Sequence, residues 1–206
     1  QNMAPHGYGD GNGAYGATQN LVDAFFTRNG LPIDEDPSYV AQGYSTEDVH
    51  YPNTAWTRSN SKEVKGLVTE AGTPNMYCNR EPRFYVSILW HREYSTQLEG
   101  FVDFLYGGAN GGPTYDSPQC GYLMRKRQHP QATEIGNQNH PYRHGIIFRL
   151  GEFYLSYAEA MNEYYGESAG AEVLEYVNAI RERAGIPAYE GTYTQAQMRE
   201  LIRRER

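Results

Sequence analysis

Hydrophobic positions near the C-terminal end of the chain recur with the spacing of amphipathic helices. One stripe, at i, i+3, i+4, i+7, i+8 and i+11, consists of Leu150, Phe153, Tyr154, Tyr157, Ala158 and Met161. A second stripe consists of Val173, Leu174, Val177, Ile180 and Ala184. Gly185 then supplies a left-handed C-terminal residue, and Pro187 prevents the helix from continuing. Because neither helix can bury its stripe alone, the pattern predicts an antiparallel helical hairpin covered by further helices.

A third helix is predicted at the end of the chain. Thr194 and Gln197 have the spacing of a capping box, which marks a helix start. The buried face of this helix would consist of Met198, Leu201 and Ile202. The chain stops at Arg206 within this helix, so the last carbonyls and the apolar stripe are expected to need partners outside the chain.

The first 146 residues show little regular periodicity. Thr18 can cap a short helix whose core-facing residues would be Leu21, Val22, Phe25 and Phe26. Residues 84–90 are the best candidate strand, because they are rich in β-branched and aromatic side chains, and residues 121–127 are a second, shorter candidate. Glycine and proline interrupt most of the remainder. We therefore predict a loop-rich region, and loops of such length usually carry function.

Composition and charge narrow the possible functions. The mean hydropathy is -0.75, and the formal net charge is -7. No run of about 18 apolar residues is present, so no membrane-spanning helix is predicted. The negative charge argues against a nucleic-acid partner, because phosphates attract a basic surface. The one basic run, Arg125-Lys126-Arg127, is expected to be a solvated strand edge.

Tyrosine is unusually frequent: the chain has 19 tyrosines and 2 tryptophans against 7 phenylalanines. Tyrosine and tryptophan join a flat apolar face to a polar tip. Sugars present the matching surface, a face of C–H groups edged with hydroxyls, so such rings flanked by polar groups can bind them without a catalytic group. The predicted ligand-binding residues are Trp56, Tyr8, Tyr15, Tyr51 and Trp90, with the polar partners Asn53 and Arg58. Trp56 is the first choice, and core packing is the alternative for Trp90.

Catalytic and metal-binding interpretations find less support in the sequence. Asp34-Glu35-Asp36 is the densest acidic cluster, and it is expected to face solvent; calcium ligation is the alternative. Glu81 lies between Arg80 and Arg83, which favours a structural ion pair. Recognised hydrolase, metalloprotease, P-loop and dinucleotide-binding motifs do not occur. We therefore predict no enzyme activity, no cofactor and no metal.

The two cysteines leave their state open. Cys78 and Cys120 could form one disulfide in an oxidising compartment, or they could remain two small buried apolar side chains. The histidine pair His140 and His144 has helical spacing, but Pro141 lies between them and disfavours a regular helix there.

Four segments, in order along the chain, resemble motifs of the SusD/RagB family of surface nutrient-binding lipoproteins. They are TQNLVDAF at 18–25 with NGLPI at 29–33; NREPRFYVSI at 79–88; GYL at 121–123 with Arg125-Lys126; and RLGEFYLSYAEAMNE at 149–163 with VNAIRERAGIP at 177–187. The resemblance extends over nearly the whole chain. It implies a mainly α fold with tetratricopeptide-like helical hairpins in a SusD-like α-α superhelix, a long loop-rich excursion and minor β structure.

The resemblance also implies a function and a location. Residues 1–146 would form the loop-rich, ligand-facing part, and residues 147–206 a truncated helical part. The protein would capture an oligosaccharide at the outer-membrane surface without catalysis and deliver it to a SusC-like TonB-dependent transporter. An N-terminal lipid anchor, which this sequence does not contain, would be its only membrane attachment. The alternatives are a peptide-binding lipoprotein of the same family and a helical interaction scaffold without a sugar site.

Overall fold

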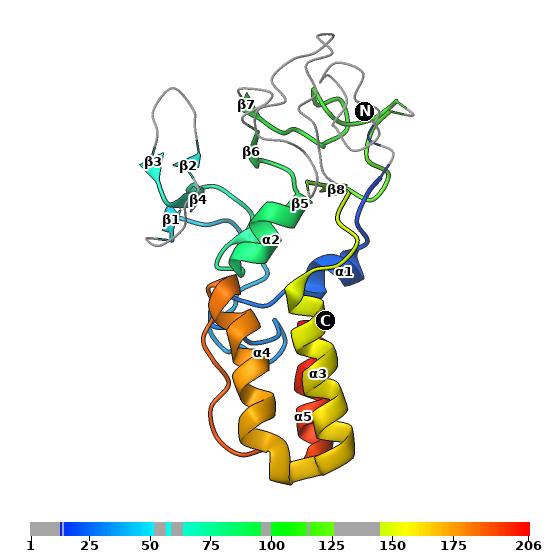
Figure 1. Ribbon diagram of the computed structural model, residues 1–206. Coiled ribbons are helices and arrows are strands. Elements are labelled where there is room, and N and C mark those ends of the chain that lie inside the picture. Colours follow the sequence, from blue (N-terminus) through cyan, green and yellow to red (C-terminus); the bar gives the residue numbers. More distant parts are fainter. Residues whose placement is uncertain are drawn as a thin grey trace. The chain divides into compact units, whose positions relative to one another are not determined.

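The structure is a computed structural model that describes residues 13, 15–51, 57–58, 64–95, 100–114, 116–125 and 145–206 (Figure 1). For residues 57–58, 64–65, 94–95 and 100 it describes the backbone only. The chain divides into two compact units. The loop-rich unit comprises Gln1–Thr27 and Pro32–Tyr142, and the helical unit comprises Arg28–Leu31 and Arg143–Arg206. Each unit is described separately below.

The helical unit contains three α-helices and one 3-10 turn within its described residues. These are α3 (Leu150–Tyr165), η2 (Gly166–Ala169), α4 (Gly170–Ala184) and α5 (Gln195–Glu205). Figure 1 shows α3 and α4 as an antiparallel hairpin with α5 beside them, and each of the three helices contacts the other two. The buried cluster between them consists of Ala158, Ala169, Val173, Val177, Met198 and Ile202. The predicted hairpin and third helix are therefore present.

Both predicted helix boundaries are confirmed by their hydrogen bonds. Gly185 ends α4 in the left-handed region with φ 76°, and its N–H donates to the carbonyls of Arg181 and Glu182. At the start of α5, the Thr194 hydroxyl accepts the Gln197 N–H, and the Gln197 side chain accepts the Thr194 N–H. Both halves of the capping box are therefore made.

The predicted buried stripe of α3 is only partly correct. Ala158 is buried and Met161 packs against the core, but Leu150, Phe153 and Tyr157 are exposed. The buried positions of α3 are instead Leu155, Ala158 and Asn162. The small side chain of Ala158 lets α4 and α5 approach α3 closely. Asn162 adds a polar link, because its side chain donates to the Gln195 carbonyl and its own carbonyl accepts from the Gln195 side chain.

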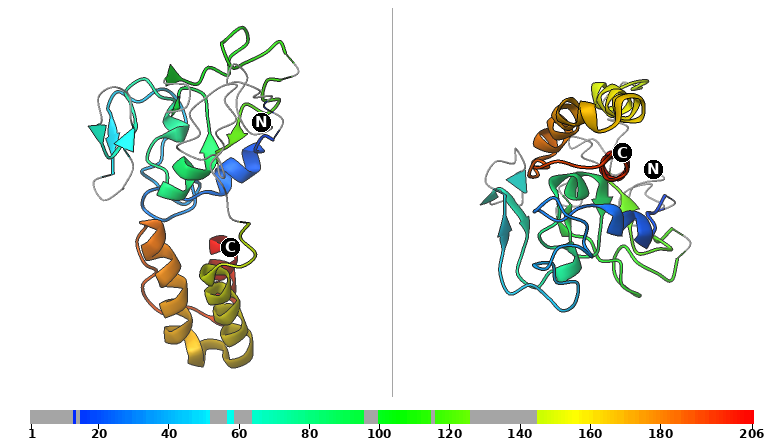
Figure 2. Two further views of the ribbon diagram at one scale, coloured as in Figure 1. Left: turned by 45° about the horizontal axis from the view of Figure 1, so that its top comes forward. Right: turned by 90° about the horizontal axis from the view of Figure 1, so that it is seen from below.

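The loop-rich unit is built from short elements. Its helices are α1 (Gln19–Ala24), η1 (Asn75–Tyr77) and α2 (Pro82–Ser87). Its strands are β1 (Val49–His50), β2 (Thr57–Arg58), β3 (Val64–Lys65), β4 (Leu67–Thr69), β5 (Ile88–Leu89), β6 (Tyr94–Ser95), β7 (Gly100–Phe101) and β8 (Leu123–Met124). The strands pair antiparallel as β1–β4, β2–β3, β5–β8 and β6–β7. Figure 1 labels these strands, and Figure 2 gives two further views of the ribbon. The predicted strand within 121–127 is β8.

The predicted strand at 84–90 is wrong over most of its length. Residues 82–87 form α2, and only the next two residues form β5. Pro82 occupies the first turn of α2, where its fixed φ suits a helix and its missing N–H costs nothing. Phe84 and Tyr85 are then buried among other rings, so tertiary packing overrides the local β preference.

In the NREPRF segment, the side chains of Arg80 and Glu81 make hydrogen bonds that stabilise the core. The buried guanidinium of Arg80 donates to the carbonyls of Val22 and Phe25 at the end of α1 and to that of Met76 in η1. Glu81 accepts the N–H of Phe26 through its carboxylate at 2.9 Å and forms an ion pair with Arg83. The predicted ion pair is therefore present, and it belongs to the core.

The helix capped by Thr18 also forms, with one change. The Thr18 hydroxyl accepts the Leu21 N–H at the start of α1. Val22 and Phe26 are buried and Phe25 packs against the core, as predicted. Leu21 is exposed, because Val22 and not Leu21 lies on the face of α1 that packs against the aromatic core.

Three further observations concern the cysteines, the acidic cluster and the helices of the described residues. Cys78 is buried, Cys120 is exposed, and both are free thiols. Of the acidic cluster expected to face solvent, Asp34 and Glu35 are exposed. Asp36 is buried, because its carboxylate accepts hydrogen bonds from the hydroxyls of Thr27 and Ser38. In the described part of the chain, no helix is both long and apolar enough to cross a bilayer.

Candidate functional site

The structure describes only some of the predicted ligand-binding residues. Trp56, Tyr8 and Asn53 lie outside the described residues. Arg58 is in β2, where only the backbone is described. The Tyr15 side chain is 58% exposed, so its ring is available to a ligand.

Tyr51 and Trp90 are core residues, which corrects their prediction as ligand-binding residues. Tyr51 is 7% exposed and Trp90 only 1%. The Tyr51 hydroxyl donates to the Arg80 carbonyl, so its polar tip is already used inside the core. The Trp90 ring stacks on Phe84 with 5.1 Å between the ring centroids. Neither ring offers a face to a ligand in this structure.

Tyr106 is a candidate that the sequence analysis missed. Its side chain is 84% exposed at the tip of a loop that spans residues 103–112. Two hydrogen bonds close this loop: the Asn110 side chain accepts the Asp103 N–H, and the Asn110 N–H donates to the Asp103 carbonyl, both at 2.9 Å. The buried Asn110 side chain therefore fixes the base of the loop that carries the exposed ring.

Further hydrogen bonds order the rest of this loop. The Asp103 carboxylate accepts the Leu105 N–H at 3.1 Å, and the Gly107 N–H donates to the Gly112 carbonyl at 2.6 Å. A Cβ atom at Gly111 would overlap the Leu105 carbonyl, and one at Gly108 would overlap the Asp103 carboxylate. The glycines are thus required for close packing, and the loop is a compact folded unit.

Tyr15 lies on a segment that packs beside the chain that follows this loop. The Met124 N–H donates to the Tyr15 carbonyl at 3.2 Å. A Cβ atom at Gly13 would lie 2.6 Å from the Asp116 carbonyl, and one at Gly16 would overlap the Cys120 sulfur. A Cβ atom at Gly112 would lie within 4.0 Å of both the Tyr106 ring and the Ser117 hydroxyl. The loop that carries Tyr106 therefore packs against the segment that follows it. We call residues 13, 15–17, 103–114 and 116–124 the loop cluster.

The loop cluster combines exposed rings with polar groups. The side chains of Tyr15 and Tyr106 are exposed, and so are the polar side chains of Thr114 and Gln119 in the same cluster. Flat apolar faces edged by hydrogen-bonding groups suit a ligand with the same alternation. Within the described residues, histidine, cysteine and acidic side chains form no group that could hold a metal ion.

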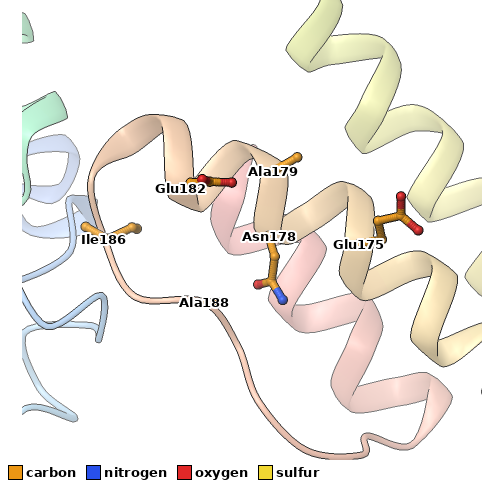
Figure 3. A pocket seen from close by; sticks show the side chains of 6 residues that line it. All are labelled: Glu175, Asn178, Ala179, Glu182, Ile186 and Ala188. Carbon is orange, nitrogen blue, oxygen red and sulfur yellow. The ribbon is translucent and has the colours of Figure 1, made fainter.

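A hollow in the helical unit is a weaker candidate (Figure 3). It lies between α4 and the segment after it, has a volume of about 480 Å³, and is lined by Glu175, Asn178, Ala179, Glu182, Ile186 and Ala188. The Asn178 side chain is occupied, because it donates to the Tyr189 carbonyl and accepts the Tyr189 N–H. The lining has no aromatic ring on which a sugar could stack.

Comparisons with known proteins identify the family. The sequence model of the SusD family matches residues 1–206, whereas a comparison with curated proteins finds no match. The SusD-like protein BF3747 from Bacteroides fragilis NCTC 9343 is 29% identical, with a TM-score of 0.60 over 99% of this chain and 36% of that chain. A structure named BT4246 is 19% identical, with a TM-score of 0.68 over 99% of this chain and 34% of that chain.

A third solved structure carries a functional description. The SusD-like carbohydrate binding protein BF0978 from Bacteroides fragilis NCTC 9343 is 17% identical, with a TM-score of 0.56 over 91% of this chain and 31% of that chain. The present chain thus spans about a third of the length of these proteins. The fold is confirmed as mainly helical with minor β structure, in agreement with tetratricopeptide-like hairpins. The chain belongs to the SusD family.

Proposed function

We propose that the protein captures oligosaccharides without catalysis and that the loop cluster forms part of the binding surface. The observation that carries this proposal is the Tyr106 ring, which is 84% exposed on a loop closed by hydrogen bonds. An apolar ring held in water on an ordered loop is a preorganised contact, because little conformational entropy is lost when a ligand covers it. Tyr15 adds a second exposed ring in the same cluster.

Family membership supports the ligand class and suggests the wider role. A solved member of this fold is named a SusD-like carbohydrate binding protein. We propose that residues 1–146 face the ligand and that residues 147–206 dock onto a SusC-like TonB-dependent transporter at the outer-membrane surface, where a lipid anchor would hold the protein. Trp56, Tyr8, Asn53 and Arg58 remain proposed ligand contacts. A peptide remains the alternative ligand.

The exposed apolar side chains at the start of α3 favour a second role as an interaction scaffold. Phe148, Leu150 and Phe153 are each more than half exposed, and the rings of Phe148 and Phe153 lie 5.9 Å apart. Exposed apolar patches of this kind mark protein–protein contact sites. This role belongs to the helical unit and is compatible with sugar binding by the loop-rich unit.

The proposed function is tested by titrating the protein with oligosaccharide and peptide panels by calorimetry. We expect an oligosaccharide to bind, and Tyr106→Ala and Tyr15→Ala each to weaken that binding about tenfold, or about 1.4 kcal/mol, because each removes a stacking face. Tyr164→Ala is the matched control, since Tyr164 is 81% exposed on α3 in the other unit and should leave the affinity unchanged.

Three outcomes would count against this function. Binding of peptides in place of sugars would support the alternative ligand, and no binding to either panel would leave only the scaffold role. Release of reducing ends from a bound oligosaccharide over time would show catalysis, which the proposal does not allow.

A further inference from the structure

His91 makes an unusual hydrogen bond at the entrance to the loop that carries Tyr106. The hairpin of β6 and β7 is extended by two backbone hydrogen bonds, from the Arg92 N–H to the Val102 carbonyl and from the Val102 N–H to the Glu93 carbonyl, both at 2.8 Å. Along an extended strand, alternate N–H groups point to the same side, so the next donor on this side is the N–H of Phe104. The Phe104 N–H donates to the Nδ1 atom of His91 at 3.2 Å. An imidazole thus takes the place of a backbone carbonyl.

This hydrogen bond requires the neutral imidazole. Nδ1 can accept the Phe104 N–H only when it carries no proton, so the proton of the neutral ring is on Nε2. Protonation would turn Nδ1 into a donor that faces the Phe104 N–H, so this hydrogen bond would be lost. The charged ring would then have the Asp103 Oδ1 3.6 Å from Nδ1. The same Oδ1 accepts the Leu105 N–H, so both neighbours of the Phe104 amide would be affected.

We propose that His91 is a positioning residue for the loop that presents Tyr106, and that protonation of its imidazole releases the Phe104 amide and weakens ligand binding. This inference rests on the proposed function, because it concerns the affinity of the same loop. Tyr106 follows Phe104 by two residues, so the released amide belongs to the backbone that leads into the residue with the exposed ring.

Burial favours the neutral form of the His91 ring. Burial has the largest effect and lowers the pKa of His91 from 6.5. The Asp103 carboxylate raises this pKa by less and the Arg92 guanidinium has the smallest, lowering effect, so the net direction is downward. A histidine whose pKa is lowered on folding binds fewer protons in the folded state. The native loop is therefore most stable above pH 6.5, and this contribution is lost as the pH falls below 6.5 and through the folded pKa.

The test compares wild type with two variants at pH 7.5 and pH 5. In His91→Asn the side-chain oxygen can still accept the Phe104 N–H but cannot titrate, and in His91→Phe the acceptor is lost. The probe is the oligosaccharide found in the titration above. We expect the affinity of the wild type to fall about fivefold at pH 5, because one hydrogen bond is lost. The affinity of His91→Asn should be the same at both pH values. The affinity of His91→Phe should be weak at both pH values.

A second readout is independent of the ligand. Hydrogen exchange of the Phe104 amide, corrected for its intrinsic pH dependence, should be protected in wild type at pH 7.5 and lose protection at pH 5, but stay protected in His91→Asn. This result supports the role of His91 even if no oligosaccharide binds. Unchanged protection in wild type overturns it. The proposed function fails separately, when Tyr106→Ala binds oligosaccharide as tightly as wild type.

Discussion

Replacing Glu205 by alanine is expected to lower the free energy of unfolding of the helical unit by about 3–5 kcal/mol. The Glu205 carboxylate is fully buried at the end of α5 and pairs with the buried guanidinium of Arg181 on α4. Replacing Glu205 removes this carboxylate from a guanidinium that is itself buried, and breaking a buried ion pair is strongly destabilising.

Arg181 holds several parts of the helical unit together, which is why the effect should be large. Its Nε donates to the Pro187 carbonyl at 2.7 Å and its Nη2 to the Gly30 carbonyl at 2.8 Å. Its guanidinium also lies 3.6 Å from the ring centroid of Tyr189. Without Glu205, the cation that anchors segment 28–31 and the loop after α4 loses its counter-charge.

The measurement is chemical denaturation followed by far-ultraviolet circular dichroism. Glu200→Ala is the matched control on the same helix, because Glu200 forms an exposed ion pair with Arg204 at 3.4 Å. That control should change the stability by less than about 0.5 kcal/mol. Equal effects of the two substitutions would show that the buried pair does not stabilise the unit.

The substitution Gly111→Ala is expected to disrupt the loop that presents Tyr106. An added Cβ would overlap the carbonyl of Leu105 and crowd the backbone of Phe104, and backbone atoms cannot rotate away as a flexible side chain can. Overpacking of this kind costs about 1–3 kcal/mol. The amides of Gly107 and Asn110 should therefore lose protection against hydrogen exchange, and oligosaccharide affinity should fall with them.

The adjacent glycine provides the control for this prediction. A Cβ at Gly112 would meet atoms only at 3.7 Å or more, which is ordinary contact. Gly112→Ala should therefore keep the loop amides protected. If Gly111→Ala also keeps them protected, the loop is not packed as the structure describes.

Local patterns predicted the helical unit well, because its helices are long and carry distinct caps. The end of α4 at Gly185 and the capping box of Thr194 depend only on neighbouring residues. The orientation of α3 could not be predicted in the same way. Its aromatic stripe is continuous on a helical wheel, but the packed face contains Ala158 and Asn162, whose partners lie on other helices.

The loop-rich unit depends more on contacts between distant residues. The segment 84–90 has the composition of a strand, but Pro82 and the burial of Phe84 produce a helix first. Core packing was already an alternative for Trp90 in the sequence, whereas the burial of Tyr51 is apparent only from its partners in the core. Tyr106 could have been found, because it precedes two glycines as Tyr15 precedes one. The hydrogen bonds by which Asn110 fixes this loop could not have been predicted, because they form only when the loop closes on Asp103.

The most direct test of the account is an NMR measurement of contacts between a bound oligosaccharide and assigned tyrosine rings. Intermolecular nuclear Overhauser effects should connect the C–H protons of the sugar with the ring protons of Tyr106 and Tyr15, and none should reach Tyr164. A bound oligosaccharide whose contacts avoid both Tyr106 and Tyr15 would contradict the account.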